Sequence, residues 1–358
     1  MPEIVPINDG GWYRQEKIYN SEDCSLGNLG KIDLGSQSIF SSHRSGWGYA
    51  IDALGSLHNP RGVLFDGFLE KNFAWLYKNN VSTGRIPYTR PWVGFFHNPM
   101  NVPDWFFSSY SLRNIIDSRP FRESLSNCLG LYTLSRNLSD ELSRELGVPI
   151  CNLIHPTEVP ELTFSLKKFI ENQSKKIVSI GWWLRKLNSI YNLPLSDSSG
   201  YTKVRLLTYD KEHPRKTIDK LMITERRETM SFMNGSTPSE YENNTEDMSR
   251  LSNENYDKLL SENIVFLDLY DSSANNAVIE CIARTTPILI NKLPSTLEYL
   301  GEDYPFFFES LDEAASKALD LDLVRKTHEY LKACDTRKKL SQEYFARSFE
   351  ESDIYKSL

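Results

Sequence analysis

The chain has 358 residues and a formal net charge of −7. This length suits two domains of ordinary size. The negative charge balance excludes most proteins that bind nucleic-acid backbones, because they need a concentrated basic surface. The sequence has no apolar run long enough to cross a bilayer and begins without the order of a signal peptide, so we expect a cytoplasmic protein. Its five cysteines are widely spread, which suits reduced thiols.

Short buried strands are expected in the first part of the chain, separated by helical or polar stretches. They are Ser38–Ser42, Gly62–Asp66, Trp92–His97, Leu129–Ser135 and Ile150–His155. Strands that alternate with helices imply a mostly parallel sheet with right-handed crossovers.

A second set of strands follows a polar, proline-bearing stretch at 156–175 that fits a linker. These strands are Lys176–Trp183, Lys203–Tyr209, Ile264–Leu269, Pro287–Asn291 and Pro305–Phe308. Residues 225–255 are polar and lack periodicity, so we predict a surface excursion there. We therefore predict an α/β protein with two doubly wound domains, at 1–155 and 156–334, and a C-terminal helix at 335–358.

The stretch from Ile264 to Asn291 says most about chemistry. Its first strand is almost entirely apolar, as expected for a strand covered on both faces. Ligands collect beyond the carboxyl ends of such strands, where the next helix presents unpaired N–H groups. Residues in the elbow can cap that helix or lie in its first turn: Ser272 and Ser273 as caps, Asn275 and Asn276 in the turn. The helix carries one carboxylate, Glu280.

This strand, elbow, glutamate-bearing helix and the following Thr-Pro-hydrophobic strand resemble the nucleotide-sugar site of GT-B glycosyltransferases, especially the retaining family 4 type. The resemblance implies two Rossmann-like domains that face each other across a cleft. It also implies that Glu280 holds the ribose of the nucleotide, while helix amides face the diphosphate. The family has an earlier glutamate, with seven residues between the two, that contacts the donor sugar. Ser272 stands at that position here, which leaves the donor sugar and the stereochemistry open.

The resemblance implies a hexosyltransferase whose donor is a UDP- or GDP-linked sugar and which needs no cofactor and no metal. The first domain would hold the acceptor, the second would hold the donor, and the C-terminal helix would return to the first domain. The acceptor would be a glycan, a lipid-linked glycan or another hydroxyl, and a lipid-linked acceptor would bring the protein to a membrane surface. Two alternatives remain: a nucleotide-sugar epimerase, or a catalytically weak subunit that binds nucleotide-sugars.

Arg185 and Lys186 follow the strand Lys176–Trp183 by a few residues. Two cations there suit a diphosphate leaving group, whose charge must be neutralised as the glycosidic bond breaks. In the resembling family, an arginine and a lysine at this place have that role. A solvated basic turn is the alternative interpretation.

The loop at 41–54 of the first domain carries Gly46 and Gly48, which would let the backbone approach a ligand closely. GT-B enzymes have a similar glycine-bearing loop near the donor diphosphate and the acceptor. His43 and Arg44 on this loop are candidates for contact with the acceptor or a phosphate. The alternative is a plain tight turn.

Asp66 and His97 each end a predicted strand of the first domain. If the enzyme inverts, one of them is the base that accepts the proton of the attacking hydroxyl. If it retains, both would be positioning groups. Alternatively, Asp66 caps the next helix and His97 bonds a backbone group.

The segment Asp320–Asp322 has the form of the metal-binding DxD of GT-A glycosyltransferases. It lies in charged helical sequence instead of following a strand, so we interpret it as a helix face and predict no metal site.

Overall fold

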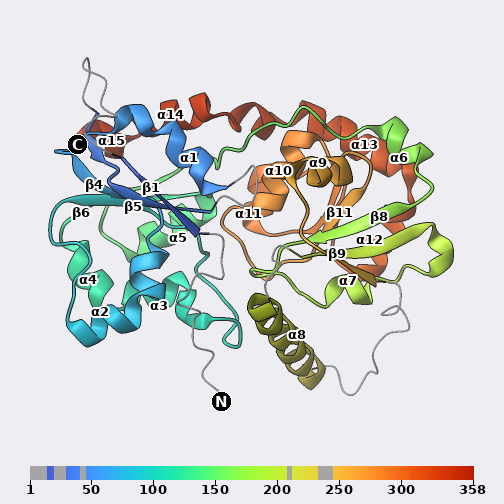
Figure 1. Cartoon of the computed structure of the whole chain (residues 1–358), viewed down its shortest axis with the longest axis horizontal. Coiled ribbons are helices and arrows are strands. Elements are labelled where there is room, and N and C mark those ends of the chain that lie inside the picture. Colours follow the sequence, from blue (N-terminus) through green and yellow to red (C-terminus); the bar gives the residue numbers. More distant parts are fainter. Residues whose placement is uncertain (1–13, 20–29, 41–45, 208–211, 233–244) are drawn as a thin grey trace. The chain divides into compact units, whose positions relative to one another are not determined.

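The computed structural model describes residues 14–19, 30–40, 46–207, 212–232 and 245–358. The chain divides into two compact units. The first unit consists of residues 1–158 together with 339–358, and the second consists of residues 159–338. Each unit contains a parallel sheet with helices on its faces (Figure 1).

The parallel sheet of the first unit has its strands in chain order. The strands are β2 (Ile32–Asp33), β4 (Val63–Asp66), β5 (Trp92–Phe95), β6 (Cys128–Thr133) and β7 (Ile150–Asn152). The strand that we predicted at 38–42 is β3 (Ser36–Phe40), and it pairs antiparallel with β1 (Arg14–Ile18) in a separate two-stranded sheet. The physical reason is Gly35, whose φ of 42° turns the chain away after β2.

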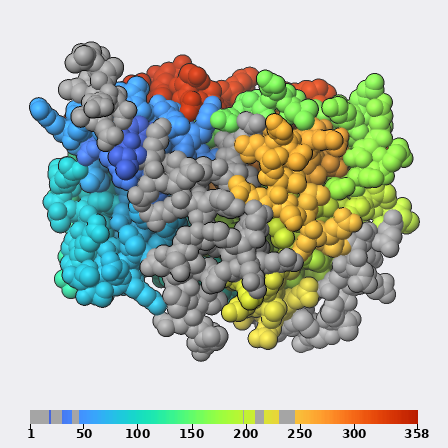
Figure 2. Space-filling view, in the orientation of Figure 1, coloured from blue at the N-terminus to red at the C-terminus, as the bar shows by residue number. Residues whose placement is uncertain are grey.

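The helices that connect successive strands from β4 to β7 lie on one face of this sheet. Those helices are α2 (Tyr77–Thr83), α3 (Leu112–Asp117), α4 (Arg119–Leu125) and α5 (Arg136–Glu145). The opposite face is covered by α1 (Trp47–Ala53), α14 (Gln342–Glu350) and α15 (Asp353–Ser357). In the space-filling view, the red C-terminal helices lie against the blue residues of this unit (Figure 2).

The C-terminal helices complete the core of the first unit. Phe349 of α14 stacks on Tyr132 of β6 with ring centroids 4.7 Å apart, and Tyr132 stacks on Phe95 of β5 at 4.8 Å. A side chain at Gly130 would lie 2.7 Å from Ile354, so α15 packs directly on the backbone of β6. The face is therefore closed by residues that come from the far end of the sequence.

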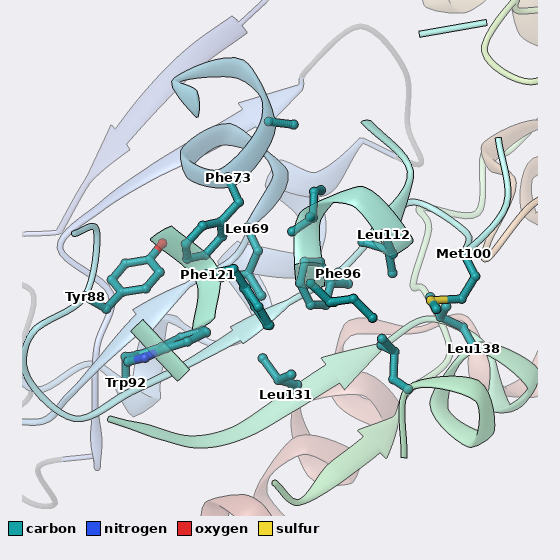
Figure 3. Close-up of a cluster of buried hydrophobic side chains, with 14 residues drawn as sticks. Leu69, Phe73, Tyr88, Trp92, Phe96, Met100, Leu112, Phe121, Leu131 and Leu138 are labelled. Carbon is teal, nitrogen blue, oxygen red and sulfur yellow. The ribbon is translucent and has the colours of Figure 1, made fainter. Parts of the chain in front are cut away.

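The other face carries a dense aromatic cluster (Figure 3). Trp92 on β5 is fully buried, and its ring lies 4.5 Å from that of Tyr88. Phe73 lies 5.5 Å from Tyr88 and 5.1 Å from Phe121. This packing fixes the residues between β4 and β5, which include the candidate groups described below.

The sheet of the second unit has the strand order β10-β9-β8-β11-β12-β13, and every neighbouring pair is parallel. Its strands are β8 (Lys175–Ile180), β9 (Tyr201–Leu206), β10 (Thr245–Met248), β11 (Ile264–Leu267), β12 (Ile288–Asn291) and β13 (Phe307–Phe308). The chain builds outward from β8 in one direction, returns beside it at β11 and then continues in the other direction. This is a doubly wound sheet with a switch point between β8 and β11.

The helices of this unit alternate with its strands. They are α6 (Leu166–Glu171), α7 (Ser189–Asn192), α8 (Glu212–Phe232), α9 (Asn253–Ser261), α10 (Asn276–Arg284), α11 (Pro294–Leu300), α12 (Leu311–Leu319) and α13 (Leu321–Ala333). The surface excursion predicted at 225–255 is wrong at both ends, since 225–232 belong to α8 and 245–248 form β10. Residues 233–244 lie outside the described part. Among the described residues, no helix is both long and apolar enough to span a membrane.

Candidate functional site

The loops that follow β8 and β11 meet at the switch point of the second unit. Arg185 and Leu269 form an antiparallel bridge, and the backbone N–H of Lys186 donates to the carbonyl of Asp268 at 2.7 Å. The N–H of Tyr270 donates to the carbonyl of Leu184 at 2.9 Å. Ligands of doubly wound sheets bind at the carboxyl ends of the two strands that flank the switch point. The predicted donor residues of both loops are therefore brought together.

The backbone after β8 is shaped to hold Arg185. Gly181 has a φ of 81°, and a side chain there would lie 3.0 Å from the Arg185 guanidinium. Leu184 has a φ of 54°, an uncommon conformation that stores strain and is found preferentially at functional sites. These two residues fold the loop tightly around the arginine.

The Arg185 guanidinium is held on three sides. It donates to the carbonyls of Ile180 and Trp183 at 3.2 and 2.6 Å, and its Nη2 donates to Oδ1 of Asn275 at 3.2 Å. Burial lowers the pKa of Arg185 to about 10, while the nearby Tyr256 and Glu280 act in the opposite direction. The group therefore carries its charge at neutral pH and lies beside the start of α10.

Lys186 has a different environment from Arg185. Its Nζ forms an ion pair with Oδ1 of Asp268 at 2.8 Å, and the two side chains are 39% and 8% exposed. The other carboxylate oxygen of Asp268 accepts from Ser189 at 2.8 Å. Lys186 thus neutralises a buried carboxylate of the adjacent loop, which leaves Arg185 as the stronger candidate for an anionic ligand.

The carboxylate of Glu225 on α8 holds the loop that follows β8. We did not predict this role from the sequence. This carboxylate accepts from the backbone N–H groups of Leu187 and Asn188 at 3.0 and 2.8 Å, and from the hydroxyl of Tyr270 at 2.7 Å. Burial raises the pKa of Glu225, although these hydrogen bonds oppose the rise. Polar sequence around Glu225 gave no local signal of this burial.

Helix α10 begins at Asn276, and its N-cap is Asn275, whose side chain accepts from the N–H of Ala277 at 3.1 Å. The prediction that Ser272 and Ser273 cap this helix is wrong. The Ser272 hydroxyl bonds that of Ser295 at 2.7 Å, so it faces α11. Ser273 is buried, and its hydroxyl has no hydrogen-bond partner in the described part of the chain.

Glu280 lies on α10, one turn beyond the cap, and is only 1% exposed. Its Oε2 accepts a hydrogen bond from the hydroxyl of Tyr256 on α9. The Arg284 guanidinium lies 5.4 Å from the Tyr256 ring and forms an ion pair with Asp257 at 2.5 Å. Tyr256 was missed because α9 and α10 are separated by a strand. Its hydroxyl orients the carboxylate that was predicted to meet the ribose.

In the first unit, Gly46 is the N-cap of α1, and Gly48 lies in the first turn of that helix. Gly46 has φ −61° and ψ 148°, so its backbone conformation does not require glycine. Trp47 between them packs edge-on against His97 with ring centroids 4.4 Å apart. His43 and Arg44 lie outside the described residues.

Asp66 ends β4 and is bonded within its own unit. Oδ1 accepts from the N–H of Phe68 at 2.8 Å, which closes a turn, so Asp66 does not cap the next helical segment, whose N-cap is Glu70. Oδ2 accepts from Asn72 at 2.9 Å and from the hydroxyl of Tyr88. These bonds fix the carboxylate and reduce its capacity to take a further proton donor.

His97 follows β5, and its ring Nε2 lies 2.8 Å from the carbonyl of Gly67. A carbonyl can only accept, so Nε2 carries the proton. Burial lowers the pKa of His97 to about 3. Such an imidazole is a weak base at neutral pH.

Glu70 lies next to the backbone of His97, and its side chain is fully buried. We did not predict this residue from the sequence. Its Oε1 accepts from the N–H groups of His97 and Asn98, both at 2.7 Å. Its Oε2 has no hydrogen-bond partner within the described residues. Burial raises the pKa of Glu70 to about 7. A charged residue between two predicted strands carried no sign of this burial.

The segment Asp320–Asp322 has structural roles. Asp320 caps α13 by accepting from the N–H of Leu323 at 2.9 Å, and Asp322 pairs with Arg325 at 2.9 Å. No group of three or more potential metal ligands occurs in the part of the chain that the structure describes.

No protein-family model matches the sequence, and no curated protein matches it. Several solved structures match its fold. A UDP-forming α,α-trehalose-phosphate synthase from Burkholderia vietnamiensis is 12% identical, with 86% of this chain and 78% of that one covered and a TM-score of 0.53. TarM from S. aureus, solved with fondaparinux, α-GlcNAc-glycerol and UDP, is 10% identical, with 82% and 55% covered and a TM-score of 0.55.

A third structure is of a trehalose-6-phosphate synthase studied with bisubstrate glycomimetics for its glycosyl transfer with retention. It is 13% identical, with 87% of this chain and 77% of that one covered and a TM-score of 0.50. These neighbours are GT-B glycosyltransferases, and the two parallel-sheet Rossmann-like units of this chain give it the same GT-B fold.

Proposed function

We propose that the protein is a glycosyltransferase that transfers a sugar from a nucleotide-sugar to a hydroxyl acceptor. The observation that carries this proposal is the meeting of Arg185, the start of α10 and Glu280 at the switch point of the second unit. UDP is the favoured nucleotide, because two of the matched structures carry UDP in their names. The second unit would hold the donor and the first unit the acceptor.

Each residue has a distinct role in this proposal. Arg185 and the N-terminal amides of α10 meet the diphosphate, whose negative charge grows as the bond between the sugar and the phosphate oxygen breaks. Asn275 links the two by binding both. Glu280 accepts hydrogen bonds from the ribose hydroxyls, for which it must exchange or share its bond to Tyr256. Because Glu280 is only 1% exposed, binding of the donor requires a local rearrangement between α9 and α10.

We also propose that the transfer proceeds with retention and without a metal. An inverting displacement needs a protein base in line with the acceptor hydroxyl. The imidazole of His97 is a weak base, and the carboxylate of Asp66 already accepts three hydrogen bonds. Retention makes no such demand, so both residues would only position the acceptor. Arg185 and the helix amides supply positive charge that a metal would otherwise provide.

The proposal is tested by incubating the full chain with UDP- and GDP-sugars, with and without EDTA, and measuring release of free nucleotide. Slow hydrolysis of one donor that Arg185→Ala abolishes and EDTA does not change is the expected result. Lys326→Ala serves as the matched loss of a cation, because Lys326 is exposed on α13, and α13 meets the C-terminal end of α10 through a bond between His328 and the carbonyl of Thr285. Absence of both hydrolysis and nucleotide binding with every donor would overturn the proposal.

A second candidate is a binding subunit with a GT-B fold and weak or no catalysis. Two observations favour it: Lys186 is already paired with Asp268, and Ser272, at the place of the family's first glutamate, faces Ser295. Such a protein would bind one nucleotide-sugar tightly and release no nucleotide with any acceptor. The same assay separates the two candidates when affinity is measured beside turnover.

A further inference from the structure

A pocket of about 250 Å³ lies within the first unit, beside β2, β3 and β4. Small-molecule pockets usually run from about 300 to 1,000 Å³. This pocket is therefore suited to one small ring and is too small for a nucleotide. It lies in the first unit alone and is distinct from the switch point described above.

The charges that line the pocket are balanced. Asp33 and Asp66 contribute carboxylates, while Lys71 and Arg90 contribute cations. Arg90 forms an ion pair with Asp33 at 2.8 Å. An anion would meet two carboxylates and a cation would meet two basic groups. The lining therefore favours a polar ligand without net charge.

Ser38 supplies an unsatisfied polar atom in this pocket. The side chain lines the pocket and is 5% exposed, and its hydroxyl has no hydrogen-bond partner within the described residues. Buried hydroxyls are normally paired, because leaving one unpaired is costly. A ligand that carries its own hydroxyl group would pair it.

The neighbouring polar groups are rigidly held. Asn72 donates through Nδ2 to Asp66 and to the hydroxyl of Tyr88, both at 2.9 Å. The Tyr88 ring is fixed in turn by Phe73 and Trp92 (Figure 3). A carboxylate, an amide and two hydroxyls held in one place match the dense hydroxyl groups of a sugar ring.

The backbone around the pocket is also unusual. Residues 71–75 form a π-helical turn, closed by a bond from the N–H of Leu76 to the carbonyl of Lys71 at 3.0 Å. Such turns are rare and occur frequently at functional sites. This turn places Lys71 and Asn72 together in the pocket wall.

We propose that this pocket binds one uncharged hexose ring, with Ser38 and Asn72 bonding its hydroxyls. The proposal rests on the proposed glycosyl transfer, and it deepens that function by naming a neutral sugar of the acceptor as the part that the first unit holds.

Binding is tested with the full chain in the absence of donor, by saturation-transfer NMR with glucose, galactose, mannose and N-acetylglucosamine. Ser38→Thr and Ser38→Val form a matched pair, because threonine and valine have the same shape and only threonine keeps the hydroxyl. We expect at least one sugar to bind at millimolar concentration. Ser38→Val should weaken it about threefold to tenfold relative to Ser38→Thr, the scale of one hydrogen bond.

Three outcomes would overturn the proposal: no binding of any of the four sugars, equal binding by the threonine and valine variants, or preference for glucose 6-phosphate over glucose by more than tenfold. Circular dichroism of the same samples shows that each variant is folded, and UDP binding is measured beside hexose binding. If hexose binding follows the expected pattern while no UDP- or GDP-sugar is bound or hydrolysed, the pocket stands and the proposed function fails. If donors are hydrolysed but no hexose binds, the pocket assignment alone fails.

Discussion

Replacing Glu70 by glutamine should change how the stability of the protein depends on pH. The amide keeps the oxygen that accepts from His97 and Asn98, both at 2.7 Å, and removes the buried acid. A pKa of about 7 in place of 4.5 corresponds to about 3 kcal/mol of unfolding free energy. Because the folded state holds this proton more tightly, Glu70 stabilises the protein fully below pH 4.5. That contribution is lost as the pH rises to about 7.

His97 acts in the opposite direction. Its pKa falls from 6.5 to about 3 on folding, so the unfolded state binds the extra proton between these values. The stability contributed by His97 is complete above pH 6.5 and is lost as the pH falls toward 3, about 5 kcal/mol in all. Between pH 4.5 and 6.5, Glu70 lowers the free energy of unfolding as the pH rises and His97 raises it, and these two effects cancel. In Glu70→Gln only the effect of His97 remains, so the free energy of unfolding should rise with pH across this range.

The assay is urea unfolding of wild type and Glu70→Gln across this pH range, followed by tryptophan fluorescence and circular dichroism. The difference in unfolding free energy, variant minus wild type, should grow by about 3 kcal/mol from pH 4.5 to pH 8. Glu145→Gln is the control, since its exposed carboxylate lies 3.6 Å from Arg113 on the surface of the same unit. A difference for Glu70→Gln that stays as flat as that of the control would refute the reasoning.

The remaining predictions concern the second unit. Arg185→Ala should lower turnover more than it lowers the affinity for uridine, because the charge that Arg185 meets grows in the transition state. Equal effects on turnover and on uridine affinity would contradict this prediction. Lys186→Ala should lower the free energy of unfolding by about 1–3 kcal/mol, because it leaves the Asp268 carboxylate without its ion pair. Urea unfolding would detect this loss. Lys186→Ala should weaken nucleotide binding less than Arg185→Ala does. Glu280→Ala should weaken UDP binding by about 1–3 kcal/mol in calorimetry, whereas Tyr256→Phe keeps the carboxylate and should bind UDP at least as well as wild type. Proton NMR of the first glycoside formed should show the anomeric configuration of the donor, and the opposite configuration would rule out retention.

The strands were predictable because their signal is local. The buried strands β11 and β12 lie within the predicted ranges Ile264–Leu269 and Pro287–Asn291, since a strand covered on both faces must be apolar along its length. The GT-B fold also followed from this pattern, through its resemblance to known glycosyltransferases. By contrast, β3 was misplaced because a single turn at Gly35 decides which sheet the next residues join.

The contacts of the candidate site were not predictable, because they join residues that lie far apart in sequence. Tyr256 meets Glu280 across 24 positions, and Glu225 meets the loop at Leu187 across 38. Glu225 lies in a polar segment whose composition does not distinguish a buried carboxylate from a solvated one. Burial of these charges depends on which helices pack together, and that is settled only by the folded unit.

The start of α10 shows how such a distant contact decides a local feature. Serine and asparagine are about equally good N-caps, so propensity alone could not choose among Ser272, Ser273 and Asn275. The side-chain oxygen of Asn275 accepts from Arg185 at 3.2 Å as well as from its own helix, and neither serine has that second partner. The arginine therefore helps to select the residue at which the helix begins. As a consequence, the positive end of α10 and the cation next to it are fixed together, ready for one anionic group.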